Sequence, residues 1–173
     1  MVIERLDERH VGLTPARAQA YYEAATVCLG RHHQPPSDAQ VNSDDVASEF
    51  TILWTAPDDR TIAANANETD ATCDGAYAVC LAAVENEKGL VAFTRAKNKS
   101  GADYYLVPAG ADFDLETAIR LEVSGVDRGD VATIQRRLDV KKKQAENGES
   151  DTPAIAAVFG FRELLVLIGT IPR

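Results

Sequence analysis

The stretch ATCDGAYAVCLAAVENE, residues 71–87, decides the fold class of this chain. Its apolar residues occur on nearly every side of a helix, and a helix of that kind is buried against other elements of the protein. Gly89 follows where a helix commonly ends. The stretch therefore predicts a core helix, and the rest of the chain has to supply a sheet for that helix to cover.

The segments around this helix supply the sheet. Strand patterns bounded by turn residues occur at 49–55, 61–64, 90–96, 102–107, 117–123, 153–161 and 163–171. Two further helices are expected at 15–29 and 130–146, because each follows a capping residue. Residues 31–47, which are rich in Pro, Ser, Asp and Asn, are expected to form the longest loop. This order predicts an α/β or α+β protein, residues 1–173 forming a single domain with one mixed β-sheet flanked by about three helices.

The amino-acid composition indicates a globular protein without a membrane span. The chain has 173 residues, of which 45% are hydrophobic and 26% are charged, as is usual for one globular domain. Apolar runs such as residues 164–168 are far shorter than the ~20 residues that span a bilayer, and residues 1–10 lack the apolar run of a signal peptide. The three cysteines form no CxxC motif. We therefore expect a cytoplasmic protein without membrane association.

The charge is acidic overall and uneven along the chain. A net charge of −9 argues against a general binder of polyanions, because phosphate contact needs a basic surface. One segment is nevertheless basic, and its cations are Arg128, Arg136, Arg137, Lys141, Lys142 and Lys143. Such a run usually marks a solvated helix face, and the alternative is a strip that binds nucleic acid.

Two carboxylates stand out against this background. In residues 117–123 apolar and polar side chains alternate, which places Glu122 on the opposite face from Leu121 and Val123. Asp103 opens the preceding strand pattern. Carboxylates on adjacent strands can hold a hard divalent cation through oxygen and leave positions open for water and a phosphate. Glu23, in the first helix, is a candidate third acidic group.

A structural interpretation of the same residues stays open. Asp103 can simply cap a strand, and Glu122 can pair with Arg120 or Arg128, since ion-pair networks also perturb carboxylates. The adjacent histidines at 32–33 are not predicted to share a metal, because consecutive side chains after a helix point in different directions.

The pattern Glu23, Asp103 and Glu122-Val123-Ser124 resembles the PD-(D/E)XK nuclease superfamily over roughly residues 23–144. Its members carry an acidic residue on an early helix, an Asp on one strand and (D/E)-x-K on the next, followed by a helix that helps to hold DNA. The resemblance implies a restriction-endonuclease-like core, with Asp103 and Glu122 as ligands of Mg²⁺ or Mn²⁺. Ser124 stands at the lysine position, so a lysine of the 130–146 helix has to replace it. Lys141, Lys142 and Lys143 are all candidates for this replacement. With Lys141 in that role, the nucleic-acid contacts would come from Arg128, Arg136, Arg137, Lys142 and Lys143.

Two functions are compatible with these residues. The first is a metal-dependent nuclease-like protein that acts on phosphodiesters. The second is a non-catalytic interaction or regulatory protein, such as a bacterial defence-associated subunit, that keeps the fold and binds a protein partner. The polar face that carries Glu122 favours the first function, whereas the overall acidity and Ser124 at the lysine position favour the second.

Overall fold

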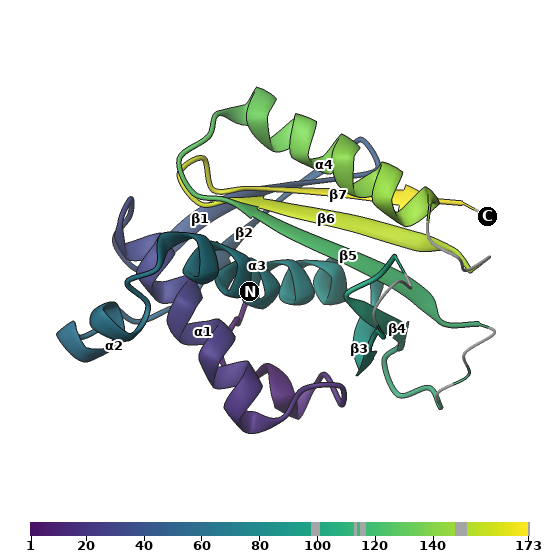
Figure 1. Cartoon of the computed structure of the whole chain (residues 1–173), viewed down its shortest axis with the longest axis horizontal. Helices are drawn as coiled ribbons and strands as arrows, with labels where there is room; N and C mark the ends of the chain where they lie inside the picture. Colours follow the sequence, from purple (N-terminus) through teal and green to yellow (C-terminus); the bar gives the residue numbers. More distant parts are fainter. Residues whose placement is uncertain (98–100, 113, 115–116, 148–151, 173) are drawn as a thin grey trace.

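The structure is a computed structural model, and it describes residues 1–97, 101–112, 114, 117–147 and 152–172. A seven-stranded mixed sheet runs through it in the order β2-β1-β7-β6-β5-β4-β3 (Figure 1). After a 3₁₀ turn at Leu6–Glu8, the elements are α1 Pro15–Gly30, β1 Ser37–Ser43, β2 Val46–Ile52, α2 Asp59–Ala64, α3 Glu68–Lys88, β3 Leu90–Arg95, β4 Tyr104–Pro108, β5 Ile119–Val126, α4 Val131–Glu146, β6 Ala154–Gly160 and β7 Leu165–Ile171.

Helices cover the two faces of the sheet unequally. Figure 1 shows α1 and α3 on one face and α4 on the other. The larger core lies between the sheet and the α1–α3 pair, and a smaller one lies beneath α4 around Ile134 and Leu138. The predicted mixed sheet flanked by helices is therefore confirmed, and residues 71–87 form the core helix α3 as expected.

Two of the expected elements are wrong. Residues 31–47 are not one loop, because β1 lies within them and pairs with β7 in parallel. Its alternation rests on small and polar residues, with Ser37 and Ser43 buried beside Ala39 and Val41, so the segment lacks the usual strand composition.

The second error concerns residues 61–64, which form helix α2 instead of a strand. The Asp58 carboxylate accepts a hydrogen bond of 2.7 Å from the Thr61 N–H and so caps the helix. The proline and acidic residues that resemble a turn are therefore a helix start.

The order of elements from α3 to β6 positions the two carboxylates. β3, β4 and β5 form an antiparallel meander, and α4 then connects β5 to the parallel strand β6. Asp103 lies immediately before β4, and Glu122 lies within β5. β4 pairs with β5 only at residues 119–121, so residues 122–126 have a neighbouring strand on the β6 side alone within the described chain.

A buried histidine links the N-terminal segment to α3 and β3. His10 Nδ1 accepts a 2.9 Å hydrogen bond from the Ala92 N–H, and Nε2 lies 3.2 Å from the Glu85 carboxylate. Burial lowers the pKa of His10 below its usual 6.5, against the opposing effect of Glu85. His10 therefore binds a proton less readily in the folded protein than in the unfolded chain.

We expect stability to be full above pH 6.5 and to fall as the pH drops below that value. The slope should reach at most about 1.4 kcal/mol per pH unit. Urea unfolding at a series of pH values should show this slope for the wild type and a flatter profile for His10→Gln. Parallel profiles for the two proteins would contradict the assignment to His10.

Candidate active site

Asp103 forms hydrogen bonds to the edge of β5 at the point where the pairing of β5 with β4 ends. Its N–H donates to the Leu121 carbonyl over 2.7 Å, and its Oδ2 accepts from the Val123 N–H over 2.8 Å. Its Oδ1 accepts from the Tyr77 hydroxyl of α3 over 2.7 Å. These partners are neutral, and within the described residues the Asp103 carboxylate has no ion pair. It therefore faces this edge without an ion-pair partner in the part of the chain that the structure describes.

Glu122 projects from β5 toward α4 and meets Lys141. The Lys141 Nζ lies 2.7 Å from Glu122 Oε2, and the two side chains are only 18% and 10% exposed. Burial raises the pKa of Glu122, the bond to Lys141 opposes that rise, and the negative charge of Asp103 adds to it. The charge of Asp103 thus acts in the same direction as burial on the pKa of Glu122.

A groove follows this edge of β5 between α3 and α4. One cavity of about 260 Å³ is bounded by Asp103 and Lys141, together with Cys73, Tyr77, Val123, Ser124, Arg137, Val140 and Gln144. A second, of about 450 Å³, shares Cys73, Ser124 and Arg137 with the first and extends past Thr69 and Thr72 to Arg128, beside the acidic residues Glu68 and Asp127. We call the two adjoining cavities the β5-edge groove. Glu122 is not on the wall of either cavity and reaches the groove through Lys141.

The structure brings only part of the expected site together. Asp103, Lys141, Arg128 and Arg137 border the groove, and Glu122 is bonded to Lys141.

Glu23 lies on α1, where its carboxylate accepts a 2.9 Å hydrogen bond from Gln19. The helices that border the groove are α3 and α4, and Glu23 lines neither of its cavities.

The basic strip does not form one surface. Successive residues of a helix are rotated by about 100°, so Lys141, Lys142 and Lys143 point in three directions. The Lys142 side chain packs over Gly169 of β7, and Lys143 is exposed. Arg136 donates to Thr133 over 2.9 Å on its own helix. The flank of α4 that faces the groove is the one that carries Arg137 and Lys141.

Tyr77 is a site residue that the sequence patterns did not reveal. It stacks on Tyr21 at 4.8 Å between ring centroids, as a core aromatic does, yet its hydroxyl holds Asp103. Burial raises the pKa of Tyr77, and the charge of Asp103 raises it further, so the hydroxyl stays protonated and donates. No sequence spacing distinguishes such a tyrosine from a purely structural one.

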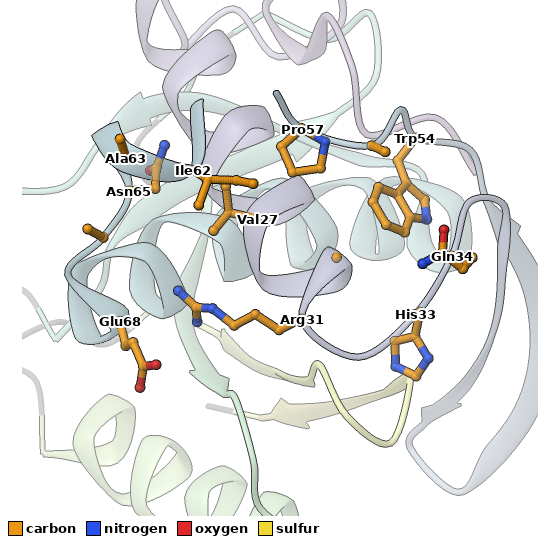
Figure 2. Close-up of a pocket in the computed structure, with 13 residues that line it drawn as sticks. Val27, Arg31, His33, Gln34, Trp54, Pro57, Ile62, Ala63, Asn65 and Glu68 are labelled. Atoms are coloured by element: carbon orange, nitrogen blue, oxygen red, sulfur yellow. The ribbon is translucent and has the colours of Figure 1, made fainter. Parts of the chain in front are cut away.

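A third cavity, also of about 450 Å³, lies at the C-terminal end of α1. Figure 2 shows Trp54, Pro57 and Ile62 along one side and Arg31 and Glu68 across from them. The Trp54 Nε1 donates to the Ser37 hydroxyl over 3.1 Å, which fixes the ring at the cavity wall. The cavity is mostly apolar and suits a small molecule in size.

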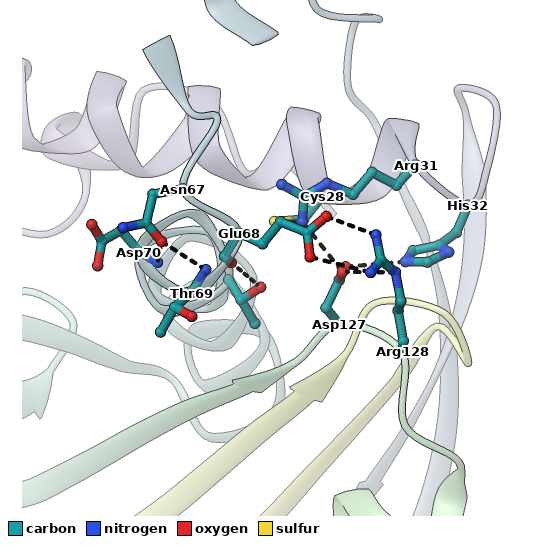
Figure 3. A network of polar contacts seen from close by, with 10 residues as sticks. Cys28, Arg31, His32, Asn67, Glu68, Thr69, Asp70, Asp127 and Arg128 are labelled. Atoms are coloured by element: carbon teal, nitrogen blue, oxygen red, sulfur yellow. Dashed lines mark hydrogen bonds and ion pairs between the residues drawn. The ribbon is translucent and has the colours of Figure 1, made fainter. Parts of the chain in front are cut away.

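A polar network separates this cavity from the β5-edge groove (Figure 3). Asp127, just after β5, lies 3.3 Å from Arg31 and 3.0 Å from His32 Nε2. Arg128 forms two bonds to Glu68, of 2.8 and 3.1 Å. The network ties the end of α1 and the start of α3 to the end of β5.

This network contains no activated nucleophile among the groups described. Burial raises the pKa of the nearby Cys28 thiol to about 11, so it is not a thiolate at neutral pH. His33 Nε2 lies 2.8 Å from the Phe161 carbonyl oxygen while His32 bonds Asp127, so the two rings have separate partners.

Comparisons with family models, curated proteins and solved structures found no match to this chain. Within the described residues, no group of three or more His, Cys, Asp or Glu side chains could hold a metal ion. No helix in that part of the chain is long and apolar enough to cross a bilayer. The geometry around Asp103 and Glu122 therefore carries the functional argument by itself.

Proposed function

We propose that this chain is a metal-dependent nuclease-like protein whose centre consists of Asp103, Glu122 and Lys141. The observation that carries the proposal is the position of Lys141, whose Nζ is 2.7 Å from Glu122 while its side chain borders the same cavity as Asp103. α4 thereby supplies the lysine that position 124 lacks. The succession α3–β3–β4–β5–α4–β6, with Asp103 at the start of one strand and Glu122 on the next, also supports the resemblance to the PD-(D/E)XK superfamily.

In this proposal Asp103 is the carboxylate that faces the cavity and would hold a hard divalent cation, with Glu122 brought to the cavity border by Lys141. Each oxygen of Asp103 accepts one hydrogen bond and keeps a further lone pair, and Glu122 has a second oxygen besides the one bonded to Lys141. Mg²⁺ is commonly held by one or two carboxylates, with waters and substrate phosphates completing the shell. Such an ion supplies charge neutralisation at a phosphate and a more acidic water molecule. Tyr77 and the Val123 N–H orient Asp103, and Lys141 offers positive charge to a phosphate in the cavity.

Calorimetric titration with Mn²⁺ tests the proposal. We expect the wild type to bind the ion and Asp103→Asn and Glu122→Gln to lose at least about tenfold in affinity, because each removes an anionic ligand. Glu49→Gln, on the exposed strand β2 at the far side of the sheet, is the matched control and should bind as the wild type does. Cleavage of a labelled oligonucleotide should follow metal affinity across the four proteins.

Thermal unfolding without metal gives an independent readout of Glu122. Its raised pKa indicates that the folded protein holds the ionised form at a cost. Glu122→Gln should therefore melt at or above the wild-type temperature, since the amide oxygen can still accept from Lys141. A clear loss of stability together with unchanged metal affinity would contradict a catalytic role.

The second candidate is a non-catalytic interaction protein, and one observation favours it. Asp103 is bonded to Tyr77 of α3 and Glu122 to Lys141 of α4, so the two carboxylates join β5 to the helices on its two faces. Carboxylates used in this way stabilise the layers and need no ion. A wild type without metal affinity and a destabilised Glu122→Gln would favour this second function over the first.

A further inference from the structure

We propose that the β5-edge groove receives a single, unpaired strand of nucleic acid, and that Arg137 binds the phosphate next to Asp103. This inference rests on the proposed function, and it names the form of the substrate and the residue that positions it.

The charges around the groove single out Arg137. Lys141 is paired with Glu122, and Arg128 is paired with Glu68. Arg137 has no hydrogen bond or ion pair in the described part of the chain, although it borders both cavities.

Asp103 is the counterpart of Arg137 in the same cavity, because its bonding partners are neutral. The cavity thus presents one carboxylate and one guanidinium without charged partners. A phosphate that arrives with a divalent cation satisfies both groups, since guanidinium binds phosphate through charge-assisted bonds and carboxylate binds the cation.

The dimensions of the groove favour a single strand. Its cavities, about 260 and 450 Å³, have the volume of small-ligand sites and lie between two helices. A duplex keeps its bases stacked inside the rod and can fill such a site only by flipping a nucleotide out at an energetic cost. An unpaired strand has no such cost and can follow the groove from Lys141 past Arg137 to Arg128.

Fluorescence anisotropy with a short fluorescein-labelled single strand tests the proposal, in buffer containing Ca²⁺, a hard cation that carboxylates bind, in place of the Mg²⁺ or Mn²⁺ proposed for cleavage. Arg137→Ala is compared with Arg136→Ala, which removes the same charge from the adjacent position outside the groove. We expect Arg137→Ala to weaken binding at least about tenfold, as for a lost hydrogen bond to a charged group, and Arg136→Ala to change it less than about twofold. The slope of log K against log salt should fall by about 0.7 for Arg137→Ala only.

A hairpin duplex of the same sequence is the second probe, and it should bind at least about tenfold more weakly than the single strand. Melting temperatures of both arginine variants should equal that of the wild type, since neither side chain is buried. Equal effects of the two arginine substitutions would overturn the role of Arg137, and tighter binding of the hairpin would overturn the preference for a single strand. Wild-type protein that binds Mn²⁺ but no oligonucleotide would refute this inference alone, whereas oligonucleotide binding through Arg137 without metal affinity would refute the proposed function alone.

Discussion

Gly75→Val is expected to destabilise the protein by about 3 kcal/mol or more, the upper range for overpacking, because α1 and α3 touch at this residue. A Cβ atom at position 75 would lie 2.9 Å from both the N and Cα atoms of Ala25, which are backbone atoms and cannot rotate away. A glycine within a helix costs up to about 1 kcal/mol relative to alanine, so the close helix contact outweighs helix propensity here. The loss would be a large part of the ~5–15 kcal/mol that stabilises a typical domain.

Urea unfolding of Gly75→Ala, Gly75→Val and a control measures this effect. Asn86→Val is the control, because it places the same side chain at an exposed position of α3. Gly75→Ala should be intermediate, since it introduces the clash without the further methyl groups. A Gly75→Val protein as stable as the control would mean that the helices can separate at no cost.

Lys141→Met is expected to lower stability by about 3–5 kcal/mol at neutral pH, as removal of one partner of a buried ion pair does. The substitution leaves Glu122 with a side chain only 10% exposed and without its 2.7 Å cation. The pKa of Glu122, already raised by burial, should then rise further.

The pH dependence of this loss has a definite sign. A carboxyl group whose pKa is higher in the folded protein holds its proton there longer than in the unfolded chain. Its contribution to stability is full below the usual pKa of 4.5 and disappears as the pH rises through the folded value. The deficit of Lys141→Met should therefore be smaller at pH 5 than at pH 7.5.

The double variant Glu122→Gln, Lys141→Met completes a double-mutant cycle with the wild type and the two single variants. It removes the buried charge as well as its partner, so it should recover most of the stability that Lys141→Met loses. Urea unfolding of the four proteins gives the coupling energy directly. A double variant as unstable as Lys141→Met would show that Lys141 acts through packing of its methylene groups and not through Glu122.

Periodicity in the sequence predicted the helices and strands whose apolar residues recur at regular intervals along the chain. Residues 71–87 were predicted to be a core helix because apolar residues occur on nearly every side, and most of them are buried in α3. The alternation around Glu122 likewise predicted its face of the strand, since the period of a strand is two. The same rules failed for β1, in which residues 40–43 pair with β7 and Ser37 and Ser43 are buried despite their polarity.

For the candidate site, too, some features followed from the sequence and others only from the tertiary structure. The sequence by itself determined the acidic composition, the core helix, and the placement of Asp103 and Glu122 on successive strand segments. Only the tertiary structure selected Lys141 from three consecutive lysines, placed Tyr77 on Asp103 and left Glu23 outside the groove. The physical reason is that residues separated by 19 or 26 positions meet through the packing of α3 and α4 on β5. Helix rotation and layer geometry fix such contacts, and no local period of the sequence encodes them.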